Sequence, residues 1–323
     1  MNGYATKLRM GFESSFSVPI LTTGYQVGFA PTLDAMTEQA INKSTVMTGS
    51  ANPTAPFLGY KDGKFSAQIP MDDKALGLFL KGAYGSPVTT LDTPAVGLNS
   101  HVFKINKDAS LAIPSMYCEV EHTDVIGGLV YTTTGISIDS MSFSLGGDGE
   151  LLVTVTGIAK DTIESTATAM LAVFDYTDGF RFGQFQAGIT GVDKLKTFDF
   201  NWNANRKTDS YLIDKTGARG DASAGINGLS GSLTSVISDG TLYASARNFV
   251  TLPLAMSFTN ELAGTALRTI DFDMLEAKLN SVSNPSIGQS DAIDSSFNYE
   301  AFYTNNVNET ALMITIVNEL VAY

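Results

Sequence analysis

The chain has 323 residues, of which 44% are hydrophobic and only 16% charged, so it can bury a substantial core under a surface rich in Ser, Thr, Asn and Gly. Its 33 acidic and 20 basic side chains give a net charge of −13, which argues against a protein that grips nucleic-acid phosphates or an acidic membrane surface. The single cysteine, Cys118, allows no intrachain disulfide and no zinc site built on thiolates.

The N-terminal residues give no sign of export or membrane insertion. Lys7 and Arg9 are not followed by the roughly 7–15 apolar residues of a signal peptide, and no run of about 18 apolar residues predicts a transmembrane helix. We therefore expect a chain that is made in a cytoplasm and works as a soluble or assembled protein.

The first half is predicted to be mainly β with one short helix. Residues 71–84 favour a helix, because Asp72 or Asp73 can cap it before apolar residues at helical spacing. Strands are predicted at 63–69, 129–133, 134–145 and 150–158. The last two alternate apolar and polar residues around a Gly-rich turn, which is typical of a β-hairpin.

The second half repeats these signals. Strands are predicted at 196–202, 229–237, 267–273, 295–303 and 310–318. A weaker helix is predicted at 239–248. The last two strands flank the turn at 305–308, so they are predicted to pair as a second hairpin.

The order of elements is the same in both halves: a long polar loop, a strand, a short helix, further strands and a closing hairpin. The repeat period is about 160 residues. We therefore predict a duplicated domain, with one copy in residues 1–180 and the other in 181–323.

No catalytic or ligand-binding motif stands out. The nucleophile-elbow, phosphate-loop, zinc-protease and dinucleotide-binding patterns are absent. His122 lies near Glu119, Glu121 and Asp124, which could ligate a metal, but a solvated polar loop is the more typical interpretation. Cys118 stands in an alternating apolar segment that favours a core position. We expect no enzyme, no metal and no cofactor.

Two further alternatives remain open. Trp202, flanked by asparagines, could form a carbohydrate-stacking platform, although strand aromatics are more often core residues. The alternating strands and the C-terminal Tyr323 also suit an outer-membrane β-barrel, which the missing signal peptide disfavours.

Two long loops, 44–62 and 208–227, point to assembly. Loops of more than about 12–15 residues are uncommon unless they have a function or are disordered, and contact with a neighbouring copy is one such function. The strands also carry few Lys or Pro residues that would protect exposed edges, so the edges are expected to pair with other subunits. The residues predicted to contact a neighbouring copy are Ser50, Asn52, Pro53, Thr54, Gly217, Arg219 and Asp221.

Several segments resemble the major tail tube proteins of long, non-contractile-tailed bacteriophages. The similarity covers 111–122 (LAIPSMYCEVEH), 130–145 (VYTTTGISIDSMSFSL) and 151–160 (LLVTVTGIAK). The G-x-E pattern from Gly11 to Pro19 and the block from Gly231 to Leu242 also match, so the resemblance spans nearly the whole chain.

This resemblance implies a structural virion protein of the tail, made in the host bacterial cytoplasm. Each copy of the domain would be a β-sandwich or a partial barrel. Strands of all subunits would join into one β-barrel around a channel. A duplicated chain implies a homotrimer with pseudo-sixfold rings, and a homohexamer is the second possibility. The other implied partners are stacked rings, the tape-measure protein, and the tail terminator and tip proteins. DNA would pass through the tube without specific binding, and no membrane contact is implied.

The acidic composition then predicts a negatively lined channel that repels phosphates and lets DNA slide during ejection. An equally typical role for surface carboxylates is a solvated outer face. The predicted channel-facing acids are Asp271, Asp273, Asp294 and Glu300.

Overall fold

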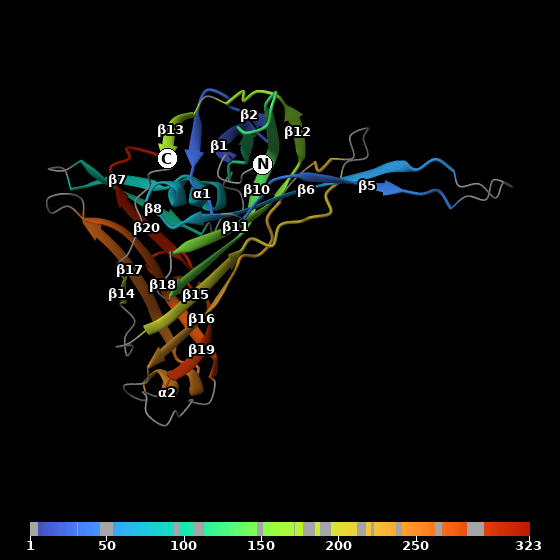
Figure 1. Cartoon of the computed structure of the whole chain (residues 1–323). Helices are drawn as coiled ribbons and strands as arrows, with labels where there is room; N and C mark the ends of the chain where they lie inside the picture. Colours follow the sequence, from blue (N-terminus) through green and yellow to red (C-terminus); the bar gives the residue numbers. More distant parts are fainter. Residues whose placement is uncertain are drawn as a thin grey trace.

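A computed structural model of the chain describes residues 6–30, 32–45, 54–93, 97–105, 113–146, 151–170, 172–176, 185–187, 195–211, 218–220, 223–236, 241–261, 267–282 and 294–323. The predicted mainly β class with two short helices is confirmed (Figure 1). The helices are α1 (Ala75–Tyr84) and α2 (Thr241–Arg247). The strands are β1 (Thr6–Ser15), β2 (Val18–Pro19), β3 (Gly24–Val27), β4 (Leu33–Asp34), β5 (Thr37–Asn42), β6 (Phe57–Pro70), β7 (Val88–Thr93), β8 (Leu98–Lys104), β9 (Met116–His122), β10 (Leu129–Gly146), β11 (Leu152–Ala159), β12 (Asp161–Ser165), β13 (Ala172–Tyr176), β14 (Phe185–Ala187), β15 (Leu195–Asn203), β16 (Gly228–Val236), β17 (Thr251–Glu261), β18 (Leu267–Val282), β19 (Asp294–Ala301) and β20 (Met313–Asn318).

A first sheet lies around the N-terminal strand. Its order is β13, β3, β1, β9, the N-terminal half of β10, and β12. β13 and β3 run parallel, and the other neighbours run antiparallel.

A second, longer sheet runs through both halves of the chain. Its antiparallel order is β5, β6, β11, the C-terminal half of β10, β15, β16, β19 and the C-terminal half of β18. β4 also pairs with β6, beside β5. The N-terminal half of β18 continues to β20, β8 and β7, and β17 covers its other edge (Figure 1).

The described strands of the two halves pair in the same order. In the first half the order is β6, β11, β10 and β9, with α1 following β6 in the chain. In the second half it is β16, β19, β18 and β17, with α2 following β16. β12 continues after β11 along β10, just as β20 continues after β19 along β18. The predicted boundary at 180/181 lies outside the described residues.

One hydrophobic core joins the sheets, and α1 crosses it. Every residue of α1 except Lys81 is buried. The N-cap residue of α1 is Lys74, not Asp72 or Asp73 as predicted. The Asp72 carboxylate nevertheless accepts hydrogen bonds from the backbone N–H groups of Lys74 and Ala75, at 2.7 Å each, and so satisfies donors at the start of the helix. Among the described residues, no helix is long and apolar enough to cross a membrane.

The predicted strands are present, but one predicted pairing is wrong. β10 and β11 form the expected hairpin. β19 and β20 are consecutive strands that do not pair, because β16 and β18 occupy both edges of β19, and β20 lies between β18 and β8. Alternation of apolar and polar residues identifies a strand but does not identify its neighbour.

Candidate assembly surfaces

A continuous polar surface covers one side of the long sheet. We call this the polar face: the outward side chains of β6, β11, β10, β15, β16, β19 and the C-terminal half of β18. One cross-strand row consists of Gln68, Thr154, Ser142, Asn201, Ser230, Glu300 and Lys278. Most of these side chains are short hydroxyls and amides, so the row carries little charge.

The polar face follows from the alternation of the strands. On the other side, the same strands bury Phe143, Phe200, Leu233 and Phe297 in the core. Neighbouring strands also bond across the polar face, as in the 2.7 Å contact between the hydroxyls of Ser140 and Thr156. The face is therefore an ordered surface fixed by the core behind it.

The four predicted channel acids lie in different places. Glu300 is exposed on the polar face. Asp294 forms an ion pair with Lys196. Asp271 and Asp273 lie half-buried on the N-terminal half of β18. Burial raises the pKa of the Asp271 carboxyl, although the Ser257 hydroxyl donates a hydrogen bond to it. The carboxylate missed by sequence reasoning is Asp199, which accepts a 2.7 Å hydrogen bond from Ser144 on the polar face.

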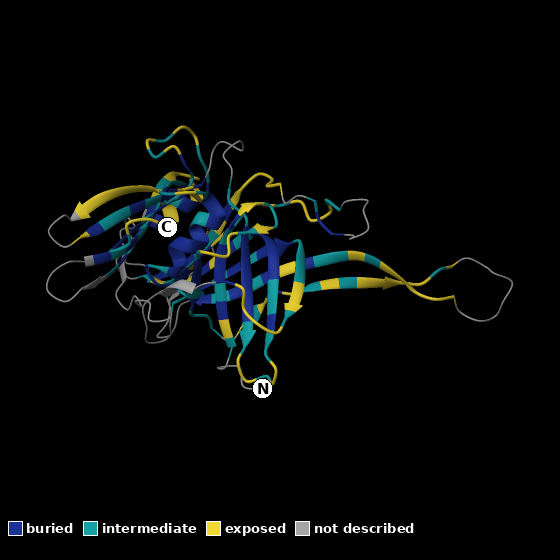
Figure 2. Cartoon of the chain, turned by 90° about the horizontal axis from the view of Figure 1, so that it is seen from above, coloured by how far each residue is buried: buried dark blue, intermediate teal, exposed yellow. Residues whose placement is uncertain are grey.

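β5 and β6 project from the body as a two-stranded arm (Figure 1, Figure 2). Its apolar side chains are unusually exposed: Ile41 and Leu58 are each 68% accessible, and Phe57 and Tyr60 are also exposed. Because exposed apolar groups gathered on one extension are unfavourable in water, this arm is a candidate contact with another molecule.

Arg219 lies at the base of this arm and is only 3% exposed. Its guanidinium pairs with Asp62 and donates to the carbonyl of Thr208 at 3.0 Å. Tyr60 stacks on Tyr211 nearby, with ring centres 4.6 Å apart. Tyr211 and Arg219, two described residues of the predicted loop, thus contact β6 of the arm, and a ring-stacking role for Arg219 stays a prediction.

Of the other predicted contact residues, Thr54 is exposed just before the start of β6. Ser50, Asn52, Pro53, Gly217 and Asp221 lie outside the described residues. Trp202 is 1% exposed, and its ring meets Tyr84 edge-on at 4.8 Å. The core interpretation of Trp202 is therefore confirmed, and a carbohydrate platform on its ring is wrong. Cys118 is also buried, as expected.

An apolar groove of about 750 Å³ opens between the first sheet and the segment that includes β4. Its lining includes Leu33, Ala35, Val120, His122 and Tyr131. His122 is half-buried, and its Nδ1 lies 3.0 Å from the Thr6 hydroxyl. No group of metal-ligating side chains occurs in the described part of the chain.

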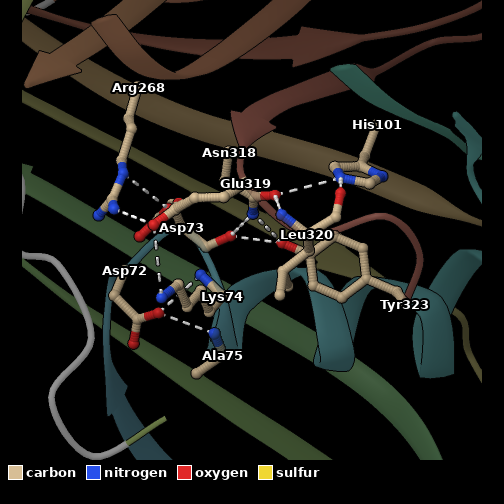
Figure 3. A network of polar contacts seen from close by, with 10 residues as sticks. All are labelled: Asp72, Asp73, Lys74, Ala75, His101, Arg268, Asn318, Glu319, Leu320 and Tyr323. Carbon is tan, nitrogen blue, oxygen red and sulfur yellow. Dashed lines mark hydrogen bonds and ion pairs between the residues drawn. The ribbon is translucent and has the colours of Figure 1, made fainter. Parts of the chain in front are cut away.

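A buried polar network joins the start of α1 to the second half of the chain (Figure 3). Arg268 pairs with Glu319 and lies 3.8 Å from the Asp73 carboxylate. Asn318 donates to the Asp73 backbone carbonyl at 2.5 Å and accepts from His101 Nε2 at 3.1 Å. Burial raises the pKa of the Asp73 carboxyl to about 7, although the Arg268 guanidinium acts against this. Sequence reasoning missed this network, because its members are far apart in the chain.

The glutamate of the G-x-E pattern, Glu13, holds two loops in place. Its carboxylate accepts hydrogen bonds from the N–H groups of Gly135 and Ser17, both at 2.7 Å, and from the Ser115 hydroxyl at 2.6 Å. Gly135 has φ +67°, and a Cβ there would lie 2.7 Å from Lys160 Cβ. This explains structurally why a carboxylate and a glycine occupy these two positions.

The comparison with known families matches residues 3–301 of the chain to the family described as Phage tail tube protein. A search of curated proteins finds no match.

Proposed function

The chain belongs to the phage tail tube protein family, and we propose that its copies form rings that stack into the tail tube, the channel through which DNA leaves the virion. The observation that carries this proposal is the long sheet. It presents a polar face on one side and ends at two strands, β5 and β18. In the described part of the chain, the outer edge of β5 and that of β18 beyond Lys278 have no strand partner. Unpaired edges are a ready template for another copy.

We infer that the chain contains two copies of one unit, because the strand order and the position of the helix recur. Eight strands of the long sheet then come from each chain, four from each unit. Three chains with eight strands each would give 24 strands. At about 4.8 Å between strands and a tilt of about 35–45°, such a barrel is about 45–50 Å across between backbones. That leaves room for double-stranded DNA and favours a trimer with pseudo-sixfold rings over a hexamer.

We propose that the polar face lines this channel. Its Ser, Thr and Asn side chains carry no positive charge that would hold phosphates. Asp199 and Glu300 add negative charge, which Lys278, opposite Glu300, offsets in part. The DNA would then slide without specific binding. The exposed arm of β5 and β6 would contact the next ring, and the tape-measure, terminator and tip proteins would meet the inside and the ends of the tube.

Negative-stain microscopy of the purified chain tests this function. We expect hollow tubes of uniform width that form above a critical concentration. A chain that sediments as a monomer at every concentration and shows no tubes would contradict the proposal.

A further inference from the structure

The two halves can be matched position by position, because irregularities of pairing recur in both. The β10–β11 register shifts between Ile138 and Ser140, and the β18–β19 register shifts between Leu279 and Ser281. The next irregularity lies between Thr133 and Ile136, and its counterpart in β18 lies between Met274 and Ala277. The spacing is the same in both strands, so Ser281 corresponds to Ser140 and Val282 to Met141.

The partner of β10 beyond this point belongs to the other half. Ser140 lies opposite Asn203, and Met141 lies opposite Trp202, both on β15. β15 is therefore a strand through which the second half joins the first, as is β20 through its pairing with β8.

The counterpart of β15 in the first half is the run of β4 and β5. β15 pairs Phe198 with Leu233 and Trp202 with Leu229 on β16. In the same way, the first half pairs Leu33 with Ala67 and Thr37 with Gly63 on β6. Matching the two sets places Thr37 at the position of Trp202 and Glu38 at the position of Asn203.

We propose that β18 of one copy pairs antiparallel with β5 of the next copy, with Ser281 opposite Glu38 and Val282 opposite Thr37. This inference rests on the proposed ring assembly and gives the register of its subunit junction. The backbone is oriented for it: the Met36 carbonyl accepts from the Lys64 N–H at 3.1 Å, toward β6. Because neighbouring backbone groups alternate in direction, those of Thr37 point away from β6.

The apolar groove supports the same partner independently. In the second half, Phe143 of β10 stacks on Phe200 at 4.2 Å and meets Phe272 edge-on at 5.3 Å. Phe143 thus fills a space between β15 and β18 with a side chain from the other half.

In the first half, the corresponding space is open. Phe258 and Phe272 have His122 and Tyr131 as counterparts, and the ring separations are alike, 6.1 Å and 6.0 Å. Phe258 and Phe272 are buried, whereas His122 and Tyr131 are half-buried and line the groove. A second copy that pairs along β5 would cover this groove as β10 covers its counterpart.

Disulfide trapping tests the register. Tubes of the Ser281→Cys/Glu38→Cys variant are oxidised and run on a non-reducing gel. Ser281 and Glu38 correspond to Ser140 and Asn203. Because the Ala204 N–H donates to the Asp139 carbonyl at 2.7 Å, Ser140 and Asn203 form a non-hydrogen-bonded pair, whose side chains are close enough for a disulfide. Burial raises the pKa of Cys118 to about 12, which keeps this thiol from competing.

We expect cross-linked dimers and trimers, with at least half of the chains linked. The matched control Ser140→Cys/Asn203→Cys has the same geometry within one chain and should link without forming dimers. The register control Ser281→Cys/Ile41→Cys moves one partner by about 10 Å and should not link.

Tubes in which Ser140→Cys/Asn203→Cys links and Ser281→Cys/Glu38→Cys does not would overturn the pairing while leaving the tube function intact. Failure of the unsubstituted chain to form tubes would instead remove the proposed function. If the cysteine variants do not assemble, hydrogen exchange on the unsubstituted chain decides: the Thr37 amide should exchange at least tenfold more slowly in tubes than in unassembled chains. Equal exchange would contradict the pairing.

Discussion

Replacement of Phe143 by alanine tests how the two halves are joined. Phe143 is completely buried where β10 meets β15, and it contacts the rings of Phe200 and Phe272. Truncation of a buried Phe costs about 3–5 kcal/mol in the free energy of unfolding, and the two ring contacts place this site toward the upper end. With an m-value of about 3 kcal/mol/M, a loss of about 4 kcal/mol lowers the urea midpoint by about 1.3 M.

The assay is urea unfolding of unassembled chains, followed by the fluorescence of the buried Trp202. The matched control is Ser142→Ala, one position along the same strand, whose side chain lies on the polar face. We expect it to change the free energy of unfolding by less than about 0.5 kcal/mol. Equal, small shifts for Phe143→Ala and Ser142→Ala would refute the assignment of inner and outer sides to β10.

Three further predictions concern other parts of the molecule. The Asp73 carboxyl keeps its proton up to about pH 7 in the folded state but loses it near pH 4 in the unfolded state, so the free energy of unfolding falls as the pH rises toward and through about 7. Between pH 6 and 8 this fall should be about 1 kcal/mol, and Asp73→Asn should remove this part of the pH dependence of Tm. Gly135→Ala should lower the free energy of unfolding by about 2–3 kcal/mol, because Gly135 has a positive φ and a Cβ there would clash with Lys160. Gly127 also has a positive φ but faces open space, so Gly127→Ala should cost only about 1 kcal/mol. Equal Tm shifts for the two variants would contradict the role of the clash. Tubes of the Asn201→Lys/Ser230→Lys variant should bind DNA in a salt-dependent manner, whereas tubes of the control variant Asn201→Ser/Ser230→Ala should not. If the lysine variant does not bind DNA more strongly than the control, the polar face does not line the channel.

The strands of this fold could be predicted from the sequence more completely than their arrangement. Alternation in 134–145 and 196–202 marked two strands correctly, because burial on one side alone produces that pattern. Nothing local indicated that these strands, some 60 residues apart, are neighbours, since backbone hydrogen bonds leave no trace in residue type. The same limit explains the wrong hairpin of β19 and β20, which were adjacent in sequence but not in the sheet.

The candidate site was predicted only in part, for a related reason. The long loops predict contacts with a neighbouring copy, yet Arg219 in one of them is buried against Asp62 of the same chain. The polar face could have been predicted by combining the polar positions of several strands, but only once their order was known. The proposed repeat of the two halves carries the most information, because it would relate the β10–β15 junction inside one chain to the proposed β18–β5 junction between chains.

Electron cryomicroscopy of assembled tubes in cross-section would show whether the long sheets of neighbouring chains join. We expect rings of three chains, in which 24 strands form one closed barrel with Asn201 and Ser230 on its inner surface. Rings in which the long sheets of separate chains remain unjoined, or in which this face points outward, would contradict it.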